Sequence, residues 1–515
     1  QTSVAGLETT DVVVGHRSSS LGPGTVKDGA SYLTALEERW VLADRARRRQ
    51  QIVEGLAKKA EELGVEVGGD EALLDEVTDL VEWPAFVAAR FEEALLDLPP
   101  RLLEESMRVH QRTFPTLKDG ALTAHVLVVS NNPQGDEQTI ALGNARVLGA
   151  RFHDARFFFA EDKKKDFGSL IGSLERMRWV RGLGTMADKQ ARVSQLCETT
   201  AALFGAEPDV AARAGALAKL DLVSGMVGEF PKLQGHMGRL YAQHAGEAPE
   251  VAMAIEEHYL PRYAGDELPT TRSGKAVALA DRLDTLTGCF GIGLIPKGSA
   301  DPQGLRRAAN GVLALLLSEQ QPSSLEALFS ASLAGFDEGI TRSADEVVAH
   351  LSEFTLGRLK ATLQAAGHRT DLADAVLAVG GDDPVQARAR VEALGRLSAS
   401  GGFGDLMMTF KRVLNISKDH KSPDYQTEQF EEAEESSLHE GVCRTEEAMR
   451  ACLAELDIDG ALSAMGELKP AVDAYFEKVL VMAEDPGLRA ARLGLLCRTS
   501  RLFLTVADFR RISTE

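Results

Sequence analysis

The hydrophobic period of the sequence changes near Arg181, and the change separates two kinds of predicted structure. Before it, LTAHVLVVSN (122–131) alternates like a half-buried strand, and residues 9–16 read as a short strand. After it, apolar residues recur at helical spacing from 186 to 366, in segments separated by Pro, Gly and Asp. The pattern predicts a mainly α multidomain protein with an N-terminal mixed α/β part.

The predicted helices of the second kind have short joints and lie at 186–205, 208–230, 249–262, 274–290, 302–319, 323–336 and 343–366. Earlier in the chain, the pattern predicts a helix over 36–63, a helix pair over 71–110, and a strand containing Phe157–Phe159. The polar, acidic stretch 417–437 reads as a linker or an exposed loop. Asp485-Pro486-Gly487 divides the helical block that follows it.

Composition limits the classes of function. The 515 residues carry a formal charge of −20, which opposes non-specific binding of nucleic acid by the whole surface but allows a local basic patch. The five cysteines form no CxxC pair, so a zinc site and a disulfide framework are poorly supported and a cytoplasmic location is expected. No apolar run is long enough to span a membrane. The Gln at position 1 and the strand-like start predict that a natural N-terminal part precedes this sequence.

Histidines and carboxylates gather between 221 and 307, which makes a metal site the first hypothesis. A helical phosphohydrolase of the HD class needs a His, a His-Asp dipeptide and a distant Asp, because a dication that bridges phosphate takes imidazole and carboxylate ligands together. Asp221 and Asp281 match the two aspartates, but Lys189 and Leu220 stand where the two histidines belong. Leu has no lone pair and protonated Lys repels a cation. The sequence therefore predicts an HD-like domain that lacks its metal ligands.

Other catalytic patterns are missing from the sequence. His236, His244 and His258 have no HxxxH or HExxH spacing, and a structural hydrogen-bonding role is predicted for each. The sequence has no GxSxG elbow, no GxxxxGK[ST] loop and no Gly-rich turn between a strand and a helix. We predict no catalytic residue in this chain.

Basic side chains remain as candidate contacts for phosphate, because ammonium and guanidinium groups suit phosphate oxygens. Ordinary surface charge is the alternative for each of them. The candidates that follow a predicted strand, begin a predicted helix or lie within FKRVLNISK are Lys163, Lys164, Lys165, Arg306, Arg307, Lys411 and Arg412.

Two long motifs resemble one family. EFPKLQGHMG (229–238) and IPKGSADPQGLRR (295–307) are similar to the β subunit of bacterial tetrameric glycyl-tRNA synthetase. VVVGHR, HQRTFP, GNARVLGARFHDARFFFAEDKKK, GLGTMADK and FKRVLNI resemble the same family, in order along the chain. The terminal LKPAVDAYFEKVLVMAEDPGLRAARLGLL resembles the helical anticodon-binding domain shared with arginyl-tRNA synthetase. The resemblance covers nearly all of the chain.

The resemblance implies an α2β2 glycine–tRNA ligase whose aminoacylation site lies on a separate α subunit. It implies that the β subunit holds tRNA(Gly) and reads its anticodon, and that ATP and Mg²⁺ are used through the α subunit, with no cofactor in this chain. The front part is similar to the tRNA-handling modules of the phenylalanyl-tRNA synthetase β subunit. The alternative hypothesis is an HD-type phosphohydrolase that acts on nucleotides or RNA.

The pattern and the resemblance together predict four regions. They are an N-terminally truncated, mixed α/β tRNA-handling region (1–181), an HD-like helical domain (182–320), a helical connecting region with the acidic linker (321–436), and a helical anticodon-binding domain (437–515). In the last region the predicted tRNA contacts are Arg489, Arg492, Arg498 and Arg501. Tyr475 and Phe476 are possible stacking residues, although core packing is the favoured interpretation for both.

Overall fold

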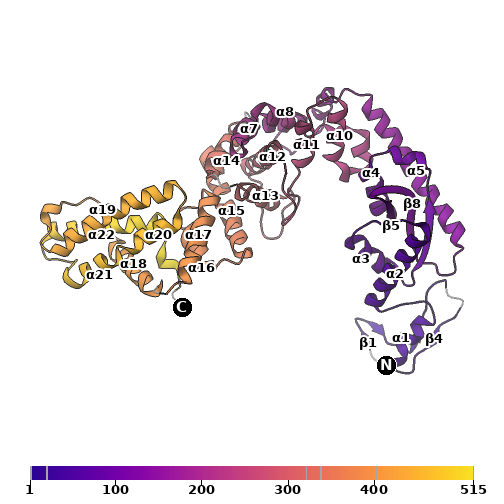
Figure 1. Cartoon of the computed structure of the whole chain (residues 1–515), viewed down its shortest axis with the longest axis horizontal. Coiled ribbons are helices and arrows are strands. Elements are labelled where there is room, and N and C mark those ends of the chain that lie inside the picture. The colour runs from indigo at the N-terminus through magenta and orange to yellow at the C-terminus, as the bar shows by residue number, and fades with distance from the viewer. Residues whose placement is uncertain (1–2, 19–20, 320–321, 337–338, 402, 514–515) are drawn as a thin grey trace. The chain divides into compact units, whose positions relative to one another are not determined.

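The computed structural model describes residues 3–18, 21–319, 322–336, 339–401 and 403–513. It is mainly helical with a small β part in the first third of the chain, which confirms the predicted fold class (Figure 1). The chain forms two compact units: Gln1–Asp166 with Ser224–Gln234, and Phe167–Val223 with Gly235–Glu515.

A four-stranded antiparallel sheet with the order β5-β7-β8-β6 organises the first unit. Its strands are β5 (Glu66–Val67), β6 (Ala85–Arg90), β7 (Phe114–Lys118) and β8 (Ala121–Ser130). A tight turn joins β7 to β8 at Asp119 and Gly120, whose φ angles of 50° and 78° suit a type I′ hairpin. β8 confirms the strand predicted over 122–131.

Helices cover both faces of this sheet (Figure 1). On one face, Phe86 and Ala88 of β6 pack against the apolar core that α2 (Arg45–Leu63) and α3 (Glu71–Leu80) contribute. Residues of β6 alternate between faces, so buried Val87 and Ala89 face the other side, where α5 (Glu137–Lys163) packs on β6.

Two predictions in this unit are wrong. Residues 85–90 form strand β6 rather than part of a helix, because their pairing with β8 overrides the helix propensity of three alanines. Phe157–Phe159 belong to α5 and not to a strand. Leu148, Phe152 and Ala155, the buried apolar residues of α5, follow helical spacing, whereas Phe157 is 60% exposed.

The other elements of this unit are short. They are β1 (Ser3–Val4) paired with β2 (Leu7–Glu8), β3 (Val12–Val13) paired with β4 (Gly24–Thr25), α1 (Gly29–Glu37), η1 (Glu93–Asp97), α4 (Pro100–Glu105), η2 (Ser106–His110), α9 (Gly225–Glu229) and η5 (Pro231–Leu233). The strand predicted over 9–16 is therefore reduced to the two residues of β3.

The second unit begins with helices packed around α12 (Arg272–Gly291), which is buried on nearly all sides. Its neighbours are α7 (Met186–Phe204), α8 (Pro208–Leu217), α11 (Pro249–Glu257), α13 (Leu305–Leu317), α14 (Leu325–Leu333) and α15 (Ala344–Ala365). Local signals set the ends of these helices: Thr185 and Asp188 form a capping box before α7, and Gly205 ends it with a φ of 59°. Other short elements of this part are η3 (Gly168–Leu170), α6 (Ile171–Leu174), η4 (Leu220–Val223) and α10 (His236–His244).

The rest of the second unit is a helical bundle with one apolar core, which extends from Leu313 to Ile512. Its elements are α16 (Thr370–Leu377), α17 (Pro384–Ser398), α18 (Phe403–Ser417), η6 (Thr427–Gln429), α19 (Ala433–Ala454), α20 (Ile458–Gly466), α21 (Lys469–Lys478), α22 (Pro486–Leu504) and η7 (Phe509–Arg511). Figure 1 shows α19 beside α22. The four predicted domain boundaries stay predictions.

Candidate nucleic-acid interface

A buried cluster of ion pairs lies where α7 packs on α12. Lys189 Nζ is 3.1 Å from Asp281 Oδ1 and 2.9 Å from Asp284 Oδ2. Lys219 Nζ is 3.2 Å from the same Asp281 oxygen, and Arg192 Nε is 2.6 Å from Asp284 Oδ1. Two ammonium groups and a guanidinium thus neutralise two carboxylates inside the protein.

Lys219, and not the neighbouring Leu220, places its side chain beside Asp281 at this cluster. Leu220 is fully buried. Asp221 caps α10 by accepting hydrogen bonds from the backbone N–H groups of Gly235 (2.5 Å) and Gly238 (3.1 Å). Among the described residues no three His, Cys, Asp or Glu side chains form a group suited to a metal ion. The absence of a metal site stays a prediction. Its physical basis is that the ammonium groups of Lys189 and Lys219 already lie against Asp281.

Burial works against charge throughout this cluster. It favours neutral Asp281, but the ammonium groups of Lys189 and Lys219 hold the pKa of that carboxyl well below its usual range. Burial also opposes charge on Lys189, yet Asp281 and Asp284 raise its pKa above the ordinary value. Burial lowers the pKa of Lys219, whose Nζ lies 2.8 Å from Nε2 of His258. The ammonium groups beside Asp281 oppose the binding of a metal cation at that carboxylate.

The arginines of α22 divide into a buried member and more open ones. Arg492 is 4% exposed, and its Nε and Nη2 lie 2.8 and 3.2 Å from the carboxylate oxygens of Glu435. Its Nη1 donates to the Leu480 carbonyl at 3.0 Å. Arg492, which was predicted to contact tRNA, is therefore already bound to groups of the protein itself. Arg489 is partly exposed and makes no ion pair with any described residue.

Arg498 and Arg501 line a hollow of about 380 Å³. Arg498 pairs with Glu446 at 2.5 Å, and exposed Arg501 donates to the Lys421 carbonyl at 2.8 Å. The other lining residues are Pro423, Asp424, Glu446, Leu502 and Thr505. Two guanidinium groups and two carboxylates thus line the hollow, and because Glu446 pairs with Arg498, Arg501 is the cation left for an anionic ligand.

The remaining predicted residues of the C-terminal bundle differ in exposure. Tyr475 is fully buried in the core, where its hydroxyl donates to the Arg492 carbonyl at 3.4 Å. Arg412 is exposed, with its guanidinium carbon 4.1 Å from the centre of the Phe476 ring. Lys411 Nζ donates to the Ile512 carbonyl at 2.6 Å.

The three consecutive lysines lie at the end of α5 in the first unit, not after a strand. Lys163 lies 5.2 Å from the centre of the Phe159 ring, Lys164 pairs with Glu161, and Lys165 Nζ is 2.9 Å from Asp162 Oδ1. All three lysines are exposed and can reach phosphate oxygens, and the surface ion pair of Lys164 is weak.

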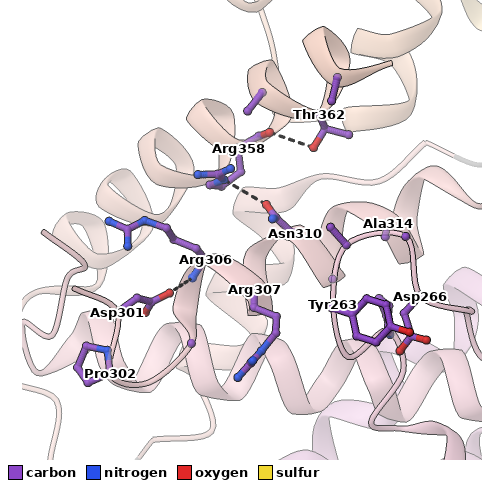
Figure 2. A pocket seen from close by; sticks show the side chains of 17 residues that line it. Tyr263, Asp266, Asp301, Pro302, Arg306, Arg307, Asn310, Ala314, Arg358 and Thr362 are labelled. Atoms are coloured by element: carbon purple, nitrogen blue, oxygen red, sulfur yellow. Dashed lines mark hydrogen bonds between the residues drawn. The ribbon is translucent and has the colours of Figure 1, made fainter. Parts of the chain in front are cut away.

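Arg306 and Arg307 border a pocket with a volume of about 740 Å³ (Figure 2). Its walls come from the loop 261–266, from α13 and its preceding turn, and from α15. The sequence predicted Arg306 and Arg307 as a basic pair at the start of a helix but gave no prediction for Tyr263, Asn310 and Arg358. No local signal marks these residues, because segments far apart in sequence bring them together.

Comparisons with known proteins give the family. A model of the glycyl-tRNA synthetase beta subunit family matches residues 1–378, and a model of the DALR anticodon binding domain matches residues 406–508. The chain is 42% identical to the glycine–tRNA ligase beta subunit of Citrifermentans bemidjiense over 501 residues, which cover 97% of this chain and 73% of the relative. It is 42% identical to that of Myxococcus xanthus over 513 residues, with 97% and 73% covered.

A third relative, the glycine–tRNA ligase beta subunit of Moorella thermoacetica, is 39% identical over 517 residues, which cover 99% of this chain and 74% of the relative. None of the described helices has the length and apolar character needed to cross a membrane. From the two family models and these identities, the chain belongs to the glycyl-tRNA synthetase beta subunit family.

Proposed function

We propose that this chain is the tRNA-binding β subunit of a glycine–tRNA ligase, and that it holds tRNA(Gly) and reads its anticodon while an α subunit performs ATP-dependent glycylation. The observation that carries the proposal is the DALR match over 406–508. That range contains most of the C-terminal bundle, including the hollow with Arg498 and Arg501 on its wall.

The proposed division of labour places the chemistry on the partner. ATP and Mg²⁺ would bind the α subunit, and this chain would contribute no catalytic group. Its contribution would be to position the tRNA, which can supply several kcal/mol of a reaction barrier when reacting groups are held in register. We further propose an α2β2 assembly in the cytoplasm.

Binding of RNA by so acidic a chain has to rely on local cations. The formal charge of −20 repels a phosphate backbone, so exposed basic side chains would set the orientation in which tRNA docks. Arg412, Arg489 and Arg501 are exposed or partly exposed, and none of them pairs with a carboxylate of the described residues. They are the favoured contacts of the C-terminal bundle.

The test combines a binding assay with a glycylation assay. The isolated chain is expected to bind a glycine tRNA transcript with an affinity that falls steeply as salt rises, and to form no glycyl-tRNA with ATP, Mg²⁺ and glycine. Addition of a glycine–tRNA ligase α subunit is expected to restore glycylation. Glycyl-tRNA formed by this chain alone would contradict the proposal.

The HD-type phosphohydrolase is not favoured, because the comparisons point to a ligase subunit and Lys189 and Lys219 occupy the place beside Asp281. A phosphate-release assay with Mn²⁺ provides the check. Release that is lost in Asp221→Ala would revive this alternative.

A further inference from the structure

Three arginines, Arg306, Arg307 and Arg358, line the pocket beside α13, and none of them makes an ion pair with a carboxylate of the described residues. Arg307 is exposed and makes no hydrogen bond or ion pair with any described residue. Arg358 is half-buried, and its one described side-chain partner is the neutral Oδ1 of Asn310, at 3.1 Å from Nε. Figure 2 shows the side chains of both arginines among the residues that line the pocket.

The two carboxylates of the pocket are already used. Asp266 accepts from Arg262, with Nε 2.9 Å from Oδ2. Asp301 accepts from the backbone N–H groups of Leu305 (2.7 Å) and Arg306 (2.8 Å), so it caps α13 and leaves those amides unable to hold an anion. An anionic ligand would therefore bind through guanidinium groups and not through the helix N-terminus.

Arg306 has a different role from Arg307. Its Nη2 donates to the Gly298 carbonyl at 2.6 Å and its Nη1 to the Ala300 carbonyl at 3.4 Å, so it holds the turn before α13. Both partners are neutral, and the charge of Arg306 therefore adds to the positive field of the pocket.

A fourth guanidinium lies beneath the pocket and fixes its loop. Buried Arg282 donates to the carbonyls of His258 and Tyr259 at 3.1 Å each and to that of Pro261 at 2.9 Å. Gly311 makes room for it, since a Cβ at that position would lie 2.4 Å from Arg282 Nε. These hydrogen bonds fix the backbone just before Tyr263, and so they hold the start of the loop that carries this side chain.

Tyr263 adds an aromatic surface. It lines the pocket and is 62% exposed, which is unusual for a large aromatic residue on a packed loop. Small side chains on α13 and α15, Ala314 and Ala361 among them, line the same pocket. The volume of about 740 Å³ is ample for one nucleotide.

We propose that this pocket binds one unstacked nucleotide of an RNA chain, with its phosphate at Arg307 and Arg358 and its base against Tyr263. Guanidinium groups suit phosphate oxygens, and proteins bind splayed RNA bases by stacking them on aromatic rings. The shared chemistry is that of a nucleoside phosphate, which a free mononucleotide also has. The proposal rests on the proposed tRNA-binding function and adds a second contact region outside the DALR match.

The experiment measures binding of a glycine tRNA transcript to the full chain across a salt series. Arg307→Gln combined with Arg358→Gln is expected to lower affinity about 10-fold or more and to reduce the salt slope by about one to two. Tyr263→Ala is expected to weaken binding several-fold without changing the salt slope, and Tyr263→Trp to restore it. The matched control combines Arg213→Gln with Arg45→Gln, which removes the same two charges from arginines already paired with Glu247 and Asp79. The control is expected to stay within about twofold of the wild type.

Two further readouts separate the outcomes. Irradiation of the complex at 254 nm followed by mass spectrometry is expected to find a nucleotide attached to the peptide that contains Tyr263. Millimolar AMP is expected to leave tRNA binding unchanged. A different outcome would overturn the RNA assignment in favour of a free nucleotide: AMP binds through Arg307 and Arg358, and loss of these arginines leaves the tRNA affinity unaffected.

If the wild-type chain binds tRNA and the arginine and tyrosine variants bind it equally well, the pocket proposal is overturned and the proposed function stands. Failure of the wild-type chain to bind tRNA would overturn both. Melting curves of every variant identify a loss of binding that comes from unfolding.

Discussion

Two sets of basic side chains in the second unit differ in what faces them. Lys189 and Lys219 lie against carboxylates in a buried cluster, whereas Arg307 and Arg358 border an open pocket and have no carboxylate partner among the described residues. The difference shows that basic residue type alone does not identify a phosphate contact. A buried cation that is paired with carboxylates is engaged within the fold, and its removal leaves a buried charge uncompensated. An accessible cation with neutral partners is available to a ligand.

The largest expected effect comes from breaking the buried cluster. Lys189→Ala leaves Asp281 and Asp284 without one of their cations inside the protein, and we expect a loss of about 3–5 kcal/mol in the free energy of unfolding. Urea denaturation measures it. The control Arg213→Ala removes an exposed pair with Glu247 and is expected to cost less than about 1 kcal/mol. Equal losses in the two variants would show that the cluster does not stabilise the fold.

The same contrast exists along α22. Arg492→Ala leaves the charge of the fully buried Glu435 uncompensated, and we expect a loss of about 3 kcal/mol in the free energy of unfolding, measured by urea denaturation. Arg501→Ala is expected to change stability by less than about 0.5 kcal/mol and to weaken tRNA binding. A filter-binding titration checks the second expectation, and unchanged tRNA affinity in Arg501→Ala would count against a contact there.

The pKa values of two buried aspartates are shifted in opposite directions. Asp281 is held below its usual pKa by lysines, whereas burial raises the pKa of Asp221 to about 6. The folded state binds a proton at Asp221 more tightly than the unfolded chain does. This contribution to stability is therefore complete below about pH 4 and is lost as pH rises through about 6.

The wild type is expected to gain up to about 3 kcal/mol relative to Asp221→Asn between pH 7 and pH 4. Paired denaturation curves at each pH measure this difference, because subtraction of the variant removes the titration of the other carboxyls. A difference that is flat with pH would contradict the raised pKa.

The smallest effect concerns two tyrosines. Tyr475→Phe removes one buried hydroxyl that donates to the Arg492 carbonyl, and we expect a loss of about 1 kcal/mol without any change in tRNA affinity. Reduced tRNA binding by this variant would contradict the core assignment. Exposed Tyr263 is expected to show the reverse, since its substitution alters binding and leaves the melting temperature nearly unchanged.

The sequence by itself determined much of this protein. Its helical periodicity, capping residues and Gly or Pro joints predicted most helices of the second unit, because these signals act within a few residues. The alternation of LTAHVLVVSN predicted β8 for the same reason. Long motifs such as IPKGSADPQGLRR carried the family, which the comparisons confirmed.

Only the tertiary structure decided the rest. β6 forms because β8 pairs with it, and an alanine-rich stretch gives no local sign of a strand. The side chain of Lys219, and not that of the next residue Leu220, lies against Asp281 of α12. Which of two neighbouring residues faces α12 depends on how the segments pack. Arg492 and Arg501 are indistinguishable as sequence letters, but packing buries one against Glu435 and leaves the other at the surface. Burial and the partners of a charge are long-range properties, and they distinguish a structural cation from a binding one.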